Sequence, residues 1–247
     1  MIKPFQLVMY SNGAKPFIAF RVGYLLGGCG VVLVRWHGHS CFEVCDSVTI
    51  VTDPHDGVSL GLPPPRVKAD VVLISHGHDD HASGRSLVAK PDAVVIDEPG
   101  AYMVKGARIK GVKAFHDDVQ GRRLGFNTIF VFEVEGVRFS HLGDLGHVLT
   151  PEQVEEMGQV DVLMVSVGGD YTLAEENIER IGPRVVIPMH YWVEGIIFPY
   201  FPLADVEEFL RDRPNVRRLG RPETTYSRET LPTEREIHVF SLEASPH

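Results

Sequence analysis

The chain has 247 residues, of which 44% are hydrophobic, so it is long enough to bury the core of one large domain. Its formal net charge of -9 argues against a partner held through many phosphates, because nucleic-acid-binding surfaces carry an excess of Lys and Arg. The composition therefore favours a small-molecule substrate over nucleic acid. Three cysteines without a CxxC spacing indicate neither a disulfide framework nor a cysteine zinc knuckle, and a cytoplasmic location is expected.

Residues 1–30 contain none of the chemical motifs described below, and we treat them as an N-terminal extension whose order the sequence does not define. The apolar stretch Phe17–Val34 is interrupted by Arg21, and Val31–Trp36 already has the character of a core strand. No segment of the sequence reaches the roughly 18 uninterrupted apolar residues that a membrane-spanning helix needs. We therefore expect no association with a membrane.

Short β-branched runs alternate with amphipathic segments along the rest of the chain, without an internal repeat or an interdomain linker. Strands are expected at Val31–Trp36, Cys41–Val44, Val48–Thr52, Val71–Ser75, Ala93–Ile96, Thr128–Glu133, Val137–His141, Val162–Val165, Val185–Pro188 and Glu236–Leu242. Strands with helices between them in both halves of the chain predict stacked layers, with sheets inside and helices outside.

Turns and the first residues of helices are predicted between these strands. Glu135 and Gly136 predict a hairpin turn between two strands. Helices are expected to start at Thr150 and Thr172, because each hydroxyl residue is followed three positions later by Gln or Glu, as in a capping box. A third helix is expected over Ala204–Arg211. The proline-rich segment 62–65 predicts a loop near the mouth of a site.

Three histidines and an aspartate lie within six residues of one another directly after a predicted strand. The segment Ser75–His81 reads SHGHDDH, and its candidate ligands are His76, His78, Asp80 and His81. Neutral imidazoles and a carboxylate suit Zn²⁺, Mn²⁺ or Fe²⁺, whereas the lack of thiolates argues against a structural zinc finger. The alternative is a polar loop with solvated histidines, which fits single histidines better than this cluster.

Four side chains in so short a segment cannot all bind one tetrahedral ion without strain, so the cluster predicts two neighbouring ions. Further ligands must then come from other parts of the chain. Three candidates each follow a β-rich run and so belong at the rim of a sheet: His116, Asp144 and His190.

The order of these motifs resembles that of the metallo-β-lactamase superfamily over about residues 31–242. The shared order is Asp53-Pro54 after a strand, H-x-H-x-D-H, an isolated His, Gly-Asp and a late His. The resemblance implies an α+β fold, a four-layer αβ/βα sandwich in which two mixed β-sheets pack face to face with helices outside. It places a hydrolase domain of this fold at residues 31–247.

The resemblance also implies a role for each candidate ligand. The first ion would be held by His76, His78 and His116, and the second by Asp80, His81 and His190. Asp144 would bridge the two ions. Asp53 would support the metal-binding loop by hydrogen bonds, without itself being a ligand.

Four segments narrow the resemblance to one branch of the superfamily. Residues 38–42, 127–130, 141–144 and 188–191 are similar to the branch that contains L-ascorbate-phosphate lactonase and related predicted hydrolases. Leu145 departs from the threonine that often follows the bridging aspartate. The resemblance therefore does not transfer a specific substrate.

The remaining histidines near these motifs each allow two interpretations. His141 is a candidate proton donor, but a histidine bonded to the backbone at a strand end fits its position equally well. His147 fits the backbone-bonded interpretation better. His39 could line the site or make a structural hydrogen bond, and Asp170, which follows two glycines, fits a turn better than a substrate contact.

Two cations about 3.5 Å apart can hold a shared water and lower its pKa toward neutrality, so the expected nucleophile is a hydroxide bound to both ions. We expect Zn²⁺, with Mn²⁺ or Fe²⁺ as alternatives, and cleavage of a small ester, lactone or phosphoester. Asp80 and Asp144 would be the catalytic carboxylates at the metals, and His141 or a metal-bound water would donate a proton to the leaving group.

Three other functions remain open from the sequence: a phosphodiesterase or nuclease, an iron redox protein and a non-catalytic metal-binding protein. The redox alternative ranks low because His78 stands where diiron relatives carry an acidic residue. The sequence is compatible with a homo-oligomer but does not require one.

Overall fold

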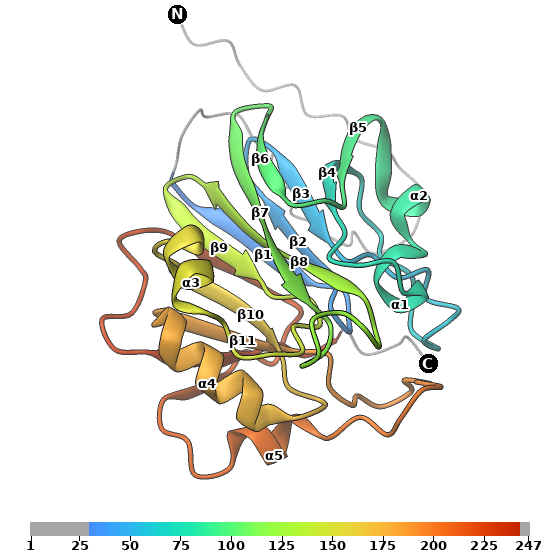
Figure 1. Ribbon diagram of the computed structural model, residues 1–247. Coiled ribbons are helices and arrows are strands. Elements are labelled where there is room, and N and C mark those ends of the chain that lie inside the picture. Colours follow the sequence, from blue (N-terminus) through green and yellow to red (C-terminus); the bar gives the residue numbers. More distant parts are fainter. Residues whose placement is uncertain (1–29, 243–247) are drawn as a thin grey trace, which may run out of the picture.

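Two mixed β-sheets pack face to face in the computed structural model, which describes residues 30–242 (Figure 1). The six-stranded sheet has the order β13 (Glu223–Tyr226), β1 (Val32–Trp36), β2 (Phe42–Cys45), β3 (Thr49–Thr52), β4 (Ala69–Leu73) and β5 (Ala89–Ile96). The eight-stranded sheet has the order β12 (Val216–Arg218), β14 (Glu236–Val239), β11 (Val185–Met189), β10 (Val162–Ser166), β9 (Val137–His141), β8 (Phe126–Val134), β7 (Ala107–Phe115) and β6 (Gly100–Val104).

Short helices cover the outer faces of both sheets. They are α1 (Asp79–Ala82), α2 (Arg85–Val88), α3 (Pro151–Met157), α4 (Tyr171–Ile181) and α5 (Val206–Leu210). The helix α2 packs on β4 and β5, whereas α3 packs on β7 and α4 on β10, on the other side of the molecule (Figure 1). The expected α+β sandwich with helices outside is therefore confirmed. Within residues 30–242, every helix is too short or too polar to span a bilayer.

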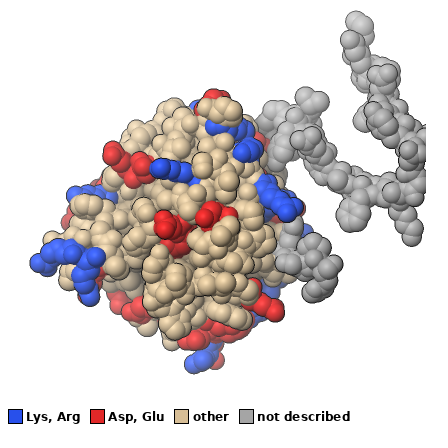
Figure 2. All heavy atoms as spheres, turned by 90° about the vertical axis from the view of Figure 1, so that its right-hand side faces the viewer, with Lys and Arg blue, Asp and Glu red and all other residues tan. Residues whose placement is uncertain are grey.

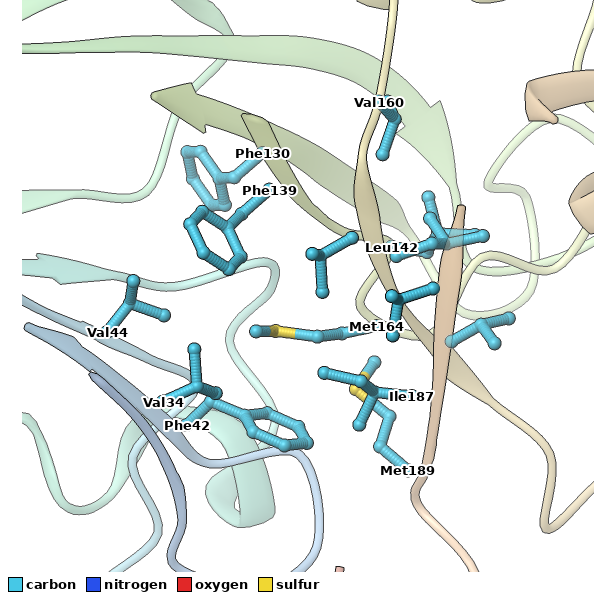
Figure 3. Close-up of a cluster of buried hydrophobic side chains, with 14 of the residues drawn as sticks. Val34, Phe42, Val44, Phe130, Phe139, Leu142, Val160, Met164, Ile187 and Met189 are labelled. Atoms are coloured by element: carbon cyan, nitrogen blue, oxygen red, sulfur yellow. The ribbon is translucent and has the colours of Figure 1, made fainter. Parts of the chain in front are cut away.

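The core lies between the two sheets, because the inner faces of their central strands are apolar. In β1, buried residues alternate with half-buried ones, as expected of a strand with one face in the core. Figure 3 shows Val34, Phe42 and Val44 of the first sheet opposite Phe130 and Phe139 of the second. The inner strands β4 and β11 are buried along their whole length and β10 up to its last residue, which is typical of parallel neighbours covered on both faces. This packing fixes the ends of the strands that carry the site.

Each of the ten predicted strands corresponds to an observed strand, with shifted ends. The strands β6, β7, β12 and β13 were not predicted from the sequence. In β7, Lys110, Gly111 and Lys113 interrupt the apolar pattern, and pairing with β8 along its length forms the strand instead. The predicted hairpin turn is confirmed, since Val134 pairs with Val137 and both turn residues have positive φ angles of 47° and 75°.

The three predicted helices are present, but one of them starts elsewhere. The capping box at Thr150 is confirmed, with reciprocal bonds between Thr150 and Gln153. The helix expected to start at Thr172 is instead capped by Asp170, whose carboxylate accepts from the Thr172 backbone N–H at 3.0 Å. Asp170, which was expected in a turn, therefore caps the N-terminus of α4. The N-terminal extension falls outside the described residues, apart from Gly30.

Asp70 of β4 is a buried carboxylate held by three donors. Its oxygens accept from the Thr49 backbone N–H at 3.0 Å, from Lys90 Nζ at 2.8 Å and from Lys105 Nζ at 2.7 Å. Burial alone would raise the pKa of Asp70, but the hydrogen bonds from Lys105, Lys90 and Thr49 lower it to about 2. The ionised carboxylate therefore stabilises the folded chain.

We expect Asp70→Asn to lower the free energy of unfolding by about 1 kcal/mol at pH 7. Because the pKa of Asp70 is lower in the folded than in the unfolded chain, its contribution is complete above the unfolded value of about 3.9. It is lost as the pH falls toward about 2. Urea unfolding of both proteins at pH 7 and pH 2.5 measures the difference, and a gap that stays undiminished at pH 2.5 would contradict this account.

Candidate metal centre

The predicted site residues lie on loops that leave the carboxyl ends of strands at one edge of the sandwich. These loops follow β1, β3, β4, β7, β9 and β11 and carry, in that order, His39, Asp53, the segment His76–His81, His116, Asp144 and His190. Residues separated by more than a hundred positions in the sequence thereby become neighbours. All seven predicted ligands fall into groups whose ligand atoms lie within 4.8 Å of one another.

The first group consists of His76, His78 and His116. His76 Nε2 lies 3.1 Å from His78 Nδ1, and the rings of His76 and His116 are 4.7 Å apart. Burial lowers the pKa of His76 to about 3, so its ring is neutral, as a metal ligand must be. His78 is exposed, which leaves this side of the site open to solvent.

The second group is buried and contains His39 together with the predicted ligands Asp80, His81 and His190. Asp80 Oδ2 lies 3.1 Å from His81 Nε2 and 3.6 Å from His190 Nε2. Burial would lower the pKa of His190, but the nearby carboxylates Asp144 and Asp80 raise it to about 9. The carboxylates at this position therefore favour a positive charge between them.

Asp144 lies between the two groups. Its Oδ2 atom is 3.4 Å from His116 Nε2 in the first group, and 3.3 and 3.1 Å from the Nε2 atoms of His81 and His190 in the second. This is the position that a ligand shared by two ions would take.

The arrangement fits a divalent metal better than an ordinary polar core. Among the described residues, the buried atoms without a hydrogen-bond partner include His81 Nε2, His190 Nε2, Asp80 Oδ1 and Asp144 Oδ1. Such an atom costs about 1–3 kcal/mol when it stays unsatisfied. The carboxylate oxygens of Asp80 and Asp144 lie 3.1 to 3.6 Å from the Nε2 atoms of His81 and His190. These distances are close to the separation of about 3.4 Å between two ligand atoms on a tetrahedral zinc ion.

Asp53 makes the supporting hydrogen bonds that the resemblance implied. It is fully buried, and it accepts from the Ser75 backbone N–H at 2.7 Å and from Ser75 Oγ at 2.6 Å. Its Oδ2 atom also lies 2.7 Å from His81 Nδ1. A proton held on Nδ1 leaves the lone pair of His81 Nε2 directed at the site.

His39 lies in the site and contacts Asp80 and His190 of the second group. Its Nε2 atom is 2.9 Å from Asp80 Oδ2, and its ring centroid is 3.9 Å from that of His190. Both proposed alternatives for His39 therefore hold, since it lines the site and makes a hydrogen bond. His39, Asp53 and His190 all have positive φ angles of 38–53°, which residues other than glycine rarely adopt. Backbone strain of this kind concentrates at functional sites.

The proton-donor role expected for His141 needs correction. His141 is fully buried, its Nε2 atom donates to the Ser40 carbonyl at 2.9 Å, and its Nδ1 atom accepts from the Gly143 N–H at 3.1 Å. With both ring nitrogens bonded to the backbone, it has none left for a substrate. His147 is likewise bonded to the backbone through both nitrogens, as expected.

Two positioning residues were missed by the sequence reading. Asn127 accepts from the Asp144 backbone N–H at 3.0 Å and donates to the Leu142 carbonyl at 2.8 Å, so it fixes the loop that carries Asp144. Asp117 accepts four backbone N–H bonds within residues 119–124 and thereby shapes the loop behind His116. The HDD sequence at 116–118 hinted at Asp117, but no spacing in the sequence pointed to Asn127.

Gly168 packs against the backbone of His190. A Cβ atom at Gly168 would lie 2.0 Å from the His190 carbonyl oxygen, whereas one at Gly169 would meet nothing within 4 Å. We expect Gly168→Ala to displace His190, to destabilise the fold by about 1–3 kcal/mol and to weaken zinc binding. Gly169→Ala is the matched control and should change stability by less than about 0.5 kcal/mol. Thermal unfolding and chelator competition measure the two effects, and equal behaviour of both variants would refute the assignment.

The fold and the two ligand groups define a metal-dependent hydrolase of the metallo-β-lactamase type. The chain matches the family model described as the beta-lactamase superfamily domain over residues 33–190, and it belongs to this superfamily. Among its relatives are the UPF0173 metal-dependent hydrolases. The one from Thermococcus onnurineus is 31% identical over 208 residues, which cover 72% of this chain and 91% of the relative. The one from Thermoplasma acidophilum is 29% identical over 203 residues, covering 71% and 88%.

A solved structure from Thermotoga maritima is also similar to this chain. It is described as that of a proposed Zn-dependent hydrolase of the metallo-β-lactamase superfamily. The two chains are 40% identical, with a TM-score of 0.68, and the match covers 86% of this chain and all of the other.

Proposed function

We propose that the chain holds two divalent cations and hydrolyses small ester, lactone or phosphoester substrates. The observation that carries this proposal is the position of Asp144 Oδ2, which lies within 3.4 Å of ring nitrogens from both ligand groups. Zn²⁺ is the first choice, with Mn²⁺ or Fe²⁺ as alternatives, because the ligands are imidazoles and carboxylates. The description of the Thermotoga maritima relative supports zinc.

Bound divalent cations would lower the pKa of a water molecule toward neutrality and so supply a hydroxide nucleophile for attack on a carbonyl carbon or a phosphorus atom. The residues of the chain prepare the site for this chemistry. Asp53 holds His81 in the orientation that directs Nε2 inward, and His39 holds Asp80. Asn127 fixes the backbone of Asp144. A site held this firmly loses little energy to rearrangement during the reaction.

The charge of the molecule supports a small substrate. On the face shown in Figure 2, the Lys and Arg side chains are scattered and form no continuous basic surface, and acidic side chains lie near the middle. A nuclease would need a basic surface to hold the phosphates of its substrate. We therefore propose a small molecule, and not nucleic acid, as the partner of this site.

A panel of lactone, carboxylic ester, phosphomonoester and phosphodiester substrates tests the proposal with zinc-reconstituted protein. We expect at least one class to be hydrolysed, with activity lost on chelation and restored by zinc. The Asp144→Ala protein serves as the blank. Turnover that survives in the chelated protein, or that is equal in the blank, would contradict the proposal.

A further inference from the structure

The loop that follows His190, residues 192–203, exposes many apolar side chains. Its sequence WVEGIIFPYFPL contains one acidic residue and no Lys or Arg. Trp192, Ile197, Tyr200 and Phe201 have exposed fractions of 46, 66, 63 and 47%. A concentration of exposed apolar surface in one loop is typical of a place where a ligand or partner binds.

Phe198 connects this loop directly to the metal centre. Its ring centroid lies 5.5 Å from that of His39 and 5.3 Å from that of His190. On its other side, the rings of Tyr200 and Phe201 lie 5.3 and 5.1 Å from Phe198. We call Phe198, Tyr200 and Phe201 the aromatic wall. It runs without a break from the imidazoles of the second group to solvent.

Hydrogen bonds at both ends and in the middle hold the loop in place. The N–H of Trp192 donates to the Ala204 carbonyl at 2.9 Å, and the N–H of Ala204 donates to the Gly168 carbonyl at 2.9 Å. The N–H of Ile197 donates at 2.8 Å to the carbonyl of Leu60, in the neighbouring loop. The wall is therefore formed before a ligand arrives, which lowers the entropic cost of binding.

The neighbouring loop shares the apolar character of the wall. Residues 57–65 read GVSLGLPPP and carry no charged side chain. A Cβ atom at Gly61 would lie 2.9 Å from the Gly195 carbonyl oxygen, so the two loops pack directly on each other. Val58 in this neighbouring loop is 87% exposed. These two packed loops thus offer apolar surface and carry no Lys or Arg.

We infer that the aromatic wall receives an apolar acyl or aryl group of the substrate, next to the bond that is cleaved. This inference rests on the proposed function and narrows it to esters or lactones that carry such a group. A phosphate or carboxylate on the same part of the substrate would need Arg or Lys partners, and the two loops provide none. The wall therefore selects against phosphorylated substrates and in favour of apolar ones.

Binding of the carboxylate products tests the wall without requiring turnover. We expect the Kd of acetate, butyrate, hexanoate and octanoate for the zinc-loaded protein, measured by calorimetry, to fall about threefold per added methylene. The double variant Tyr200→Ala and Phe201→Ala should flatten this series. Met103→Ala is the matched control, because Met103 is 65% exposed and lies on the edge strand β6, in neither of the two loops. It should leave the series unchanged.

The corresponding p-nitrophenyl esters complete the test. In the wild-type protein, kcat/KM should rise with acyl length in parallel with binding, and the double variant should lose this rise. Hydrolysis without any dependence on chain length, or a preference for phosphorylated lactones, would overturn the wall while leaving the hydrolase proposal intact. A steep binding series in a protein that cleaves none of the esters supports the wall but contradicts the proposed hydrolysis.

A second copy of the chain is the competing occupant of this surface. In that case the wild-type protein would be a dimer in light scattering, the double variant would be a monomer, and the binding series would be flat in both. That combination would overturn the inference.

Discussion

If the chain holds metal as we propose, replacing Asp144 by alanine is expected to lower the metal content of the protein and its rate of hydrolysis. Asp144 Oδ2 lies within 3.4 Å of imidazole nitrogens of both groups, so its loss affects both positions at once. Partners that merely orient metal ligands already change metal affinity or activity by about 10- to 100-fold. The loss of a shared ligand should exceed that range, with kcat falling more than about 100-fold.

A matched control for this prediction lies in the histidine-rich segment. Asp79 is an exposed carboxylate between His78 and Asp80, and it belongs to none of the ligand groups. Asp79→Ala should keep the metal content and the activity of the wild-type protein. Metal analysis by mass spectrometry and initial rates measure both quantities. Full activity in the Asp144→Ala protein would remove the basis of the proposed mechanism.

Replacing Asp53 by alanine is expected to have the largest effect on stability. The change leaves three donors unpaired in the buried interior: the Ser75 N–H, the Ser75 hydroxyl and His81 Nδ1. Removing one partner from a buried charged network costs about 3–5 kcal/mol. We expect urea unfolding of the metal-free protein to show a loss of this size, and zinc affinity to fall at least about tenfold.

Asp53→Asn separates the two effects of this residue. Its amide keeps one oxygen that accepts from Ser75, but it cannot hold the proton on His81 as a carboxylate does. We therefore expect a smaller loss of stability than for Asp53→Ala, together with a similar loss of zinc affinity. A wild-type zinc affinity in both variants would show that Asp53 has no part in orienting His81.

Local patterns in the sequence predicted the parts of the site that local chemistry determines. The cluster from His76 to His81 is visible because its ligands are close in sequence and follow an apolar strand. His116, Asp144 and His190 could be chosen because each follows a strand, and strands of one sandwich end at common edges. The resemblance in motif order allowed the predicted ligands to be assigned to the two groups.

Features that depend on tertiary contacts were beyond the sequence. His141 precedes Asp144 by three residues, but its orientation depends on the Ser40 carbonyl, more than a hundred positions away. Asn127 acts on Asp144 across two paired strands, so no spacing in the sequence predicts it. The contact of Phe198 with His39 likewise exists only in the folded chain.

The failure to predict β12 and β13 has a similar physical cause. β12 and β13 are short and half-exposed, and they lie at the edges of their sheets. Their sequences lack the continuous apolar runs of the inner strands, because their side chains are only partly buried. The core strands, by contrast, were predicted because burial on both faces requires apolar residues throughout.

Anomalous X-ray diffraction at the zinc edge, on crystals of the zinc-reconstituted protein, tests the central claim most directly. We expect two peaks about 3.5 Å apart. One should lie among His76, His78 and His116, the other among Asp80, His81 and His190, and both within bonding distance of Asp144. A single peak, or peaks away from these residues, would contradict the two-metal centre.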